Sequence, residues 1–156
     1  MATRARIAIE NTDGSIFSSY QHWDGYPSGL GFNLTSHWDN PETLREAISL
    51  GDASHWGKRI APINEHSFDS PEENVNVYYG RDRGENNVGP KTFDDFESFV
   101  SGFDCAGEEF AYCLRCNGTW SMINRWAGRA VTHDAEDDII LARADVIISH
   151  RNSIAA

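Results

Sequence analysis

The sequence predicts a small single-domain α+β protein in which two antiparallel hairpins pack against two to four helices. The chain has 156 residues, of which 40% are hydrophobic, and this is the size and composition of one domain with one core. Two β-rich segments are each interrupted by a tight-turn sequence. Patterns typical of helix starts and helical spacing lie between these two segments.

The first predicted hairpin lies at the N-terminus. Residues 6–10 and 15–20 are short β-favouring runs. The Asp-Gly pair between them suits a tight turn, because glycine adopts positive φ angles without steric cost. Residues 26–29 contain Pro and Gly and are expected to break the chain away from the second strand. Residues 30–38 are then predicted as a short helix.

A longer helix is predicted to begin at Asn40-Pro41. An Asn side chain can accept hydrogen bonds from the free N–H groups of a first helical turn, and Pro suits the first helical position. Gly51 is expected to end this helix. Its apolar face is predicted to consist of residues at helical spacing, namely Leu44, Ala47 and Ile48.

The middle of the chain carries weaker signals. Residues 52–73 contain two Pro and show no clear period, so we predict an irregular segment, which is a common location for a site. Residues 75–79 are predicted as a strand, and residues 80–90 as a loop rich in Gly and Asn. A second helix is expected over residues 92–102, with Thr92 as its cap and with apolar residues on one side, namely Phe93, Phe96, Phe99 and Val100.

The second hairpin is predicted at residues 110–123, where an Asn-Gly pair suits a type I′ turn between two β-rich arms. Residues 132–149 are predicted as a C-terminal helix behind an acidic start, while their β-branched residues also allow a strand near residues 145–149. We therefore divide the chain into an α+β domain, residues 1–126, and a C-terminal helical extension, residues 127–156, packed on the same domain.

Charge limits the expected partners. The chain has 13 Lys and Arg against 24 Asp and Glu, a formal net charge of -11. Such a charge repels phosphate backbones, so direct binding to nucleic acid is not expected. No apolar run has the length of a signal peptide or a membrane span, so we predict a cytoplasmic protein without membrane partners. If a phage encodes the chain, the compartment is the host cytoplasm.

No cofactor or metal is predicted. Cys113 and Cys116 form a C-x-x-C pattern that, with Cys105 and His133, invites a zinc site. On a regular strand, however, two residues three apart point to opposite faces, which argues against shared coordination. A second group with possible metal ligands lies in the irregular segment, at His55, Glu65, His66 and Asp69. Its spacing matches no metal-binding motif, so surface histidines and caps are the preferred interpretation.

The first candidate site is the turn after the first hairpin. His22, Trp23, Asp24 and Tyr26 combine two titratable groups with two aromatic rings at the end of a strand. If the strand continued, His22 and Asp24 would face the same way, as a carboxylate that orients an imidazole must. The alternative is that the two form a hydrogen-bonded pair that holds the turn.

The second candidate site is an arginine-bearing loop. Arg81 and Arg83 lie between glycines in a chain that is otherwise poor in positive charge. Guanidinium groups match phosphate and carboxylate oxygens, so this loop is the best candidate for binding an anion. The alternative is a solvated turn in which neighbouring carboxylates neutralise both arginines. The candidate residues of this loop are Tyr79, Arg81, Asp82, Arg83 and Glu85.

Three segments resemble the signature segments of a group of small uncharacterised proteins encoded by tailed phages and bacterial genomes. They are His22-Trp23-Asp24-Gly25-Tyr26-Pro27, Leu50-Gly51-Asp52 and Tyr79-Gly80-Arg81-Asp82-Arg83-Gly84-Glu85. The resemblance covers about residues 4–120, and this chain departs from the group in Cys113, Cys116 and the extension beyond about residue 126. It implies a phage or prophage origin, where small accessory proteins bind host factors or host signals, and it implies no activity.

These observations lead to one leading hypothesis and two alternatives. The leading hypothesis is an accessory protein, without catalysis, that binds a small anionic ligand such as a nucleotide or a host defence signal. The first alternative is a hydrolase or phosphodiesterase that uses His22, Asp24 and Arg81 or Arg83. The second is an acidic inhibitor of a host protein, including a nucleic-acid mimic, and homo-oligomers are compatible with each. The two pocket hypotheses require the two candidate segments to share one hollow.

Overall fold

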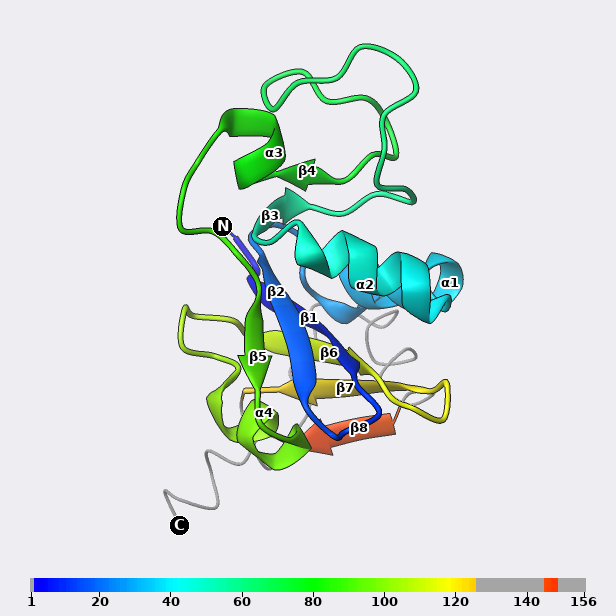
Figure 1. Ribbon diagram of the computed structural model, residues 1–156, viewed down its shortest axis with the longest axis vertical. Coiled ribbons are helices and arrows are strands. Elements are labelled where there is room, and N and C mark those ends of the chain that lie inside the picture. Colours follow the sequence, from blue (N-terminus) through cyan, green and yellow to red (C-terminus); the bar gives the residue numbers. More distant parts are fainter. Residues whose placement is uncertain (1, 126–144, 149–156) are drawn as a thin grey trace.

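The computed structural model describes residues 2–125 and the backbone of residues 145–148. It confirms a small α+β domain (Figure 1). The described elements follow one another as β1 (Ala5–Glu10), β2 (Ile16–Gln21), a π-helical turn η1 (Pro27–Gly31), α1 (Phe32–His37), α2 (Pro41–Ser49), β3 (Ala53–His55), β4 (Val77–Tyr78), α3 (Tyr79–Arg83), β5 (Lys91–Phe93), α4 (Phe96–Gly102), β6 (Phe110–Leu114), β7 (Trp120–Asn124) and β8 (Asp145–Ile148).

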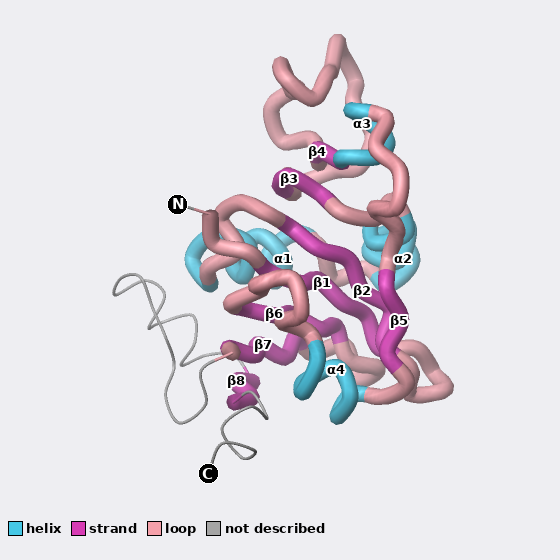
Figure 2. Tube along the Cα trace, turned by 90° about the vertical axis from the view of Figure 1, so that its left-hand side faces the viewer, coloured by secondary structure: helices cyan, strands magenta, loops and turns pink. Residues whose placement is uncertain are grey.

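The strands form one mixed sheet in the order β4-β3-β2-β1-β6-β7-β8, and β5 pairs with β2 beyond this path. Both predicted hairpins are confirmed, because β1 pairs antiparallel with β2 and β6 pairs antiparallel with β7. The two hairpins meet through β1 and β6, which run parallel over the register Ala5↔Phe110 to Ile9↔Leu114. This parallel pairing joins segments about a hundred residues apart into the centre of the sheet (Figures 1 and 2).

Side chains alternate along the strands, so the sheet has one apolar core on each face. On β1, Ile7 packs into the core that α1 and α2 cover, where it joins Leu34 and Leu44. Its neighbour Ala8 packs on the opposite face, where α4 contributes Phe99. The first core is the larger of the two and is the one next to the pocket described below.

Helix α2 begins as predicted. The Oδ1 atom of Asn40 accepts hydrogen bonds from the backbone N–H groups of Glu42, at 3.0 Å, and Thr43, at 3.2 Å. Gly51 follows the helix with a φ of +85°, a conformation that glycine adopts without strain. In the part of the chain that the structure describes, no helix has the length and apolar character needed to cross a membrane.

Two middle elements differ from the prediction. The helix expected over residues 92–102 begins only at Phe96, where Asp95 caps it by accepting a hydrogen bond from Ser98 N at 2.7 Å. Residues 91–93 instead form β5, because they pair antiparallel with residues 16–18, the first half of β2. The strand expected over residues 75–79 is limited to β4, and the loop predicted from residue 80 starts with the short helix α3.

The C-terminal helix prediction is wrong for residues 145–148. These residues form β8, which runs parallel to β7 in the register Ser121↔Asp145 to Asn124↔Ile148. The run Val146-Ile147-Ile148 is β-branched throughout and suits a strand, as the alternative prediction allowed. The rest of the predicted helix, and of the predicted helical extension at residues 127–156, lies outside the described residues.

Candidate functional site

A pocket of about 370 Å³ opens between the turn after β2 and the segment after β3. This volume falls within the range of small-molecule sites. Its lining combines aromatic rings, amide groups and four ionisable side chains. The lining residues are Gln21, Asp24, Tyr26, Gly29, Leu30, Phe32, Asn33, His37, His55, Trp56, Gly57, Lys58 and Asn74.

The first wall of the pocket begins where β2 ends. The side chain of Gln21 donates a hydrogen bond to Trp23 O at 2.6 Å and accepts one from Trp56 N at 3.0 Å, which ties the two walls together. Asp24 then adopts a φ of +58°, in the left-handed region that costs a non-glycine residue energy. Its carbonyl oxygen accepts a hydrogen bond from Leu30 N at 3.0 Å, so the turn closes on itself.

The same wall continues through the π-helical turn η1 (Pro27–Gly31), a form that is frequent at functional sites. Glycines allow its close packing. A Cβ atom at Gly29 would lie 2.6 Å from Asp24 O, and one at Gly31 would lie 2.8 Å from the Cε atom of Met122. The glycines that weaken the helical signal of this segment are therefore needed by the tertiary structure.

The second wall is a rigid backbone segment around Gly57. Its N–H donates to Asn76 Oδ1 at 2.7 Å, and its carbonyl oxygen accepts from Trp38 Nε1 at 3.0 Å and from Asn33 Nδ2 at 2.9 Å. A Cβ atom at this position would lie 2.4 Å from Asn74 O. Asn74 itself has a φ of +66°. Both walls thus contain a strained non-glycine residue that the surrounding contacts hold in place.

One exposed aromatic side chain lines this pocket, and a second belongs to the residue before a lining residue. Phe32, which lines it, is 52% exposed, and Trp23, which precedes the lining residue Asp24, is 44% exposed. They are two of the three exposed large hydrophobic side chains in the described part of the chain. Apolar surface of this kind next to a concave site is typical of a ligand-binding region.

The ionisable side chains of the pocket are one carboxylate, Asp24, and three bases, His37, His55 and Lys58. Burial lowers the pKa of His55 below its usual value of 6.5, and the nearby carboxylate of Asp24 opposes this shift. His55 is therefore largely neutral at pH 7 and gains its charge only under more acidic conditions. With three bases against one carboxylate, the pocket lining differs from the chain as a whole, which has a net charge of -11.

The structure brings only part of the first candidate segment into the pocket. Asp24 and Tyr26 line it, but His22 does not. The Nδ1 atom of His22 lies 2.7 Å from the hydroxyl of Tyr20, and its ring meets Trp23 edge-on at 4.7 Å. The predicted pairing of His22 with Asp24 fails because the strand ends at residue 21 and the left-handed turn redirects Asp24 towards His55.

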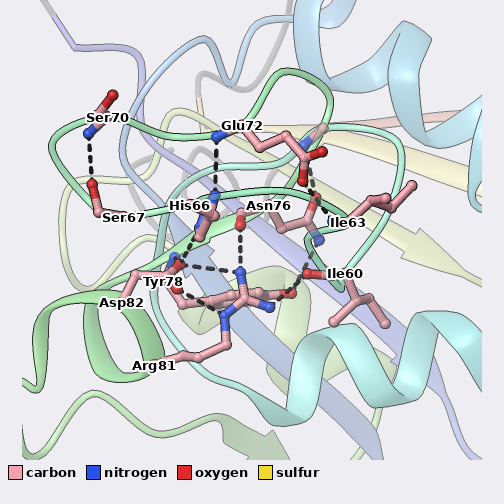
Figure 3. Close-up of polar contacts among 11 residues, drawn as sticks. Ile60, Ile63, His66, Ser67, Ser70, Glu72, Asn76, Tyr78, Arg81 and Asp82 are labelled. Carbon is pink, nitrogen blue, oxygen red and sulfur yellow. Dashed lines mark hydrogen bonds and ion pairs between the residues drawn. The ribbon is translucent and has the colours of Figure 1, made fainter.

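Arg81 is engaged inside the protein (Figure 3). Its Nη1 and Nη2 atoms donate to the carbonyl oxygens of Ile60, at 2.5 Å, and Asn76, at 2.7 Å. Its Nε atom donates to Asp82 Oδ1 at 2.9 Å. Asp82 also accepts a hydrogen bond from Tyr78 N at 2.8 Å, at the residue that precedes α3. Both residues therefore hold the chain together, which is a correction to their predicted role as ligand contacts.

Arg83 is neutralised in the way the alternative prediction described. Its Nε atom donates to Glu85 Oε2 at 2.6 Å, and its guanidinium lies over the ring of Phe68 at 4.2 Å and that of Tyr79 at 5.0 Å. None of residues 79–85 lines the pocket. The two candidate segments therefore do not share this pocket, and the premise that they form one site is wrong. In addition, nearby carboxylates and carbonyl oxygens already bind both guanidinium groups.

Of the remaining pocket residues, the sequence singled out only His55, which it presented as a possible metal ligand and not as part of a ligand pocket. Trp56 and Lys58 do lie in residues 52–73, the irregular segment expected to hold a site. Asn33, His37 and Asn74 carry no pattern that separates them from ordinary surface residues. They share only their place in the pocket lining, which exists once the two walls are assembled.

Cys113 and Cys116 lie in different environments and do not form the zinc site that their spacing suggested. Cys113 is buried in the core beneath α4, where burial raises the pKa of its thiol, while Cys116 is exposed at the turn between β6 and β7. Within residues 2–125, no group of three or more His, Cys, Asp or Glu side chains is arranged to hold a metal ion. His133 lies outside the described residues.

No protein-family model matches the chain, and neither the curated proteins nor the solved structures yield a match. The fold and the site define a mixed-sheet α+β protein with a pocket at the end of β2. Its function must be inferred from the chemistry of that pocket.

Proposed function

We propose that this chain is a phage-type accessory protein that binds, without catalysis, a small anionic ligand with a planar ring, such as a nucleotide. The observation that carries this proposal is the composition of the pocket. It places the half-exposed ring of Phe32 in the same hollow as Lys58, His37 and His55, with Asp24 as the one carboxylate of its lining.

Aromatic side chains supply the ring-binding part of the proposed site. Phe32, Tyr26 and Trp56 line the pocket, and stacking of a base on such a ring is worth about 1–3 kcal/mol. Trp56 is only 6% exposed and is held against Trp38 at 4.8 Å between ring centres. A rigid wall of this kind lowers the entropic cost of ordering the site around a ligand.

Basic side chains supply the anion-binding part. Lys58 is exposed at the pocket and can pair with a phosphate as a point charge, and His55 adds a charge when it is protonated. Lys58 thereby takes the role that the sequence hypothesis gave to Arg81 and Arg83. The positions of His22, Asp24 and Arg81 argue for binding over hydrolysis, since these groups do not converge on one point.

Lys58→Ala and Phe32→Ala are each expected to weaken nucleotide binding about tenfold or more, because each removes one of the two recognition elements. Isothermal titration calorimetry with nucleoside mono-, di- and triphosphates and cyclic nucleotides, including host signal nucleotides, measures this effect. Arg83→Ala is the matched control, since it deletes a cation outside the pocket and should change the Kd by less than about twofold. Absence of binding across the panel, or an equal loss in Arg83→Ala, would contradict the proposal.

Binding of a cyclic nucleotide is expected to strengthen as the pH falls from 8 to 5.5. Burial lowers the pKa of His55 in the free protein, so its imidazole is largely neutral there. A bound anion beside the imidazole favours the charged form and raises this pKa, so binding is accompanied by proton uptake. A phosphodiester keeps its charge over this range, so the ligand does not contribute to the slope. His55→Gln should make the profile less steep, whereas His22→Gln, outside the pocket, should leave its slope unchanged. A flat wild-type profile would exclude His55 from the site.

A further inference from the structure

A second feature of the molecule is the long loop between β3 and β4, which projects from the end of the sheet (Figures 1 and 2). Its residues 61–63, Ala-Pro-Ile, are all exposed. The side chain of Ile63 is 75% exposed, the largest exposed fraction among the three exposed large hydrophobic residues of the described chain. The pocket does not include this tripeptide.

Glu72 holds the backbone of the loop at Ile63. Its carboxylate accepts hydrogen bonds from Ile63 N at 2.7 Å and from Asn64 N at 3.2 Å, and a third from Asn64 Nδ2 at 2.8 Å. The Nη2 atom of Arg59 lies 3.1 Å from the same carboxylate. The opposite arm of the loop therefore fixes the peptide groups on both sides of the exposed isoleucine.

The base of the loop is fixed by α3 (Figure 3). Arg81 binds the carbonyl oxygens of Ile60 and Asn76, one on each arm. His66 is almost fully buried; its Nδ1 atom accepts from Glu72 N at 3.1 Å, and its Nε2 atom lies 3.2 Å from Asp82 Oδ2. The loop is thus braced along its length by polar groups, although it contains neither helix nor strand.

These contacts fix the backbone of the apolar tripeptide and leave its residues exposed. None of these contacts uses the side chain of Ile63, because those nearest to it are made by Ile60 O, Ile63 N and Asn64 N, so they stabilise the loop whatever side chain stands at position 63. Because the loop is already ordered, binding a partner through Ile63 does not have to reduce the conformational entropy of the loop backbone any further. Such a side chain, central and surrounded by polar groups, has the arrangement of an interface anchor.

We propose that residues 60–72 form a docking loop for a second protein, with Ile63 inserted into an apolar pocket on that protein and with basic residues at the rim of that pocket. Charge complementarity argues for a basic rim. Glu65 and Asp69 are exposed carboxylates of the loop, Glu73 is exposed directly after it, and the chain as a whole has a net charge of -11. This interaction is independent of ligand binding in the pocket.

A photo-crosslinking amino acid at position 63, compared with the same group at the exposed position Ser101 on α4, tests the proposal in host cells. The protein crosslinked from position 63 is then purified, and its Kd is measured by calorimetry. Ile63→Asp is expected to raise the Kd at least about tenfold, as for an interface anchor, and Ile63→Val only a few-fold. The association rate should fall as salt rises, because a basic rim attracts the acidic loop at long range.

Three results would overturn the docking proposal: no crosslinked protein from position 63, equal crosslinking from position 101, or unchanged affinity of the purified partner for Ile63→Asp. Because Ile63 is exposed, Ile63→Asp should keep the wild-type melting temperature, which separates lost docking from lost folding. The same variant should also keep the nucleotide affinity of the wild type. Failure of this proposal and failure of the pocket proposal are therefore distinguishable.

Discussion

Replacing Arg6 with alanine is expected to lower the free energy of unfolding by about 3–5 kcal/mol. The Nε atom of Arg6 lies 2.8 Å from Glu108 Oε2, with side chains that are 7% and 0% exposed. The Nη1 atom of Arg6 also donates to Ser18 Oγ at 3.1 Å, so the guanidinium links β1, β2 and the segment before β6. Removing it leaves the carboxylate of Glu108 buried without its counter-charge, which is far costlier than losing a solvated pair.

Urea unfolding measures this loss, and Arg83→Ala is the matched control. Arg83 and Glu85 form an ion pair of similar length, but their side chains are 49% and 39% exposed, so this variant should lose less than about 1 kcal/mol. The double replacement Arg6→Met with Glu108→Leu should recover most of the stability, since neither charge is then buried alone. Equal stability of Arg6→Ala and Arg83→Ala would show that water reaches Glu108.

Trp38→Ala is expected to cost about 3–5 kcal/mol and to abolish ligand binding in the pocket. Trp38 is 2% exposed, its ring lies 4.8 Å from that of Trp56, and its Nε1 atom donates to Gly57 O at 3.0 Å. The truncation therefore opens a cavity directly behind the second wall of the pocket. It also releases the carbonyl of Gly57, which helps to fix that wall.

Thermal unfolding and calorimetry with a nucleotide measure the two effects of Trp38→Ala separately. Trp38→Phe should keep part of the packing and give intermediate values of both quantities. Trp23→Ala is the control for stability, because this ring is 44% exposed and its loss should change the free energy of unfolding by less than about 1 kcal/mol. If Trp38→Ala kept wild-type affinity, the ligand site would lie away from the second wall.

Several elements of the fold could be predicted because neighbouring residues encode them. The Asp-Gly and Asn-Gly turns specify the two hairpins, and Asn40-Pro41 specifies the start of α2. Other elements depend on distant partners. Residues 91–93 read as the start of a helix but extend as β5, since β2 offers a free edge. Residues 145–148 likewise become β8 by pairing with β7.

The candidate site was predicted only in part. Asp24 and Tyr26 line the pocket, and their position at a strand end was visible in the sequence. Arg81 and Arg83 suggested an anion site because their partners could not all be seen. Arg83 pairs with Glu85, two residues away, which the alternative prediction included, but Arg81 binds the carbonyl of Ile60, twenty-one residues away. Backbone acceptors of this kind leave no trace in a sequence pattern.

Turn and capping signals act over a few residues, so both hairpins and the start of α2 follow from local sequence, while composition sets the α+β size class and the net charge of -11. Three features follow only from the assembled fold: the parallel pairing of β1 with β6, the presence of Asp24 and not His22 in the pocket lining, and the internal hydrogen bonds of Arg81. Each of them depends on groups that the fold brings together from distant parts of the chain.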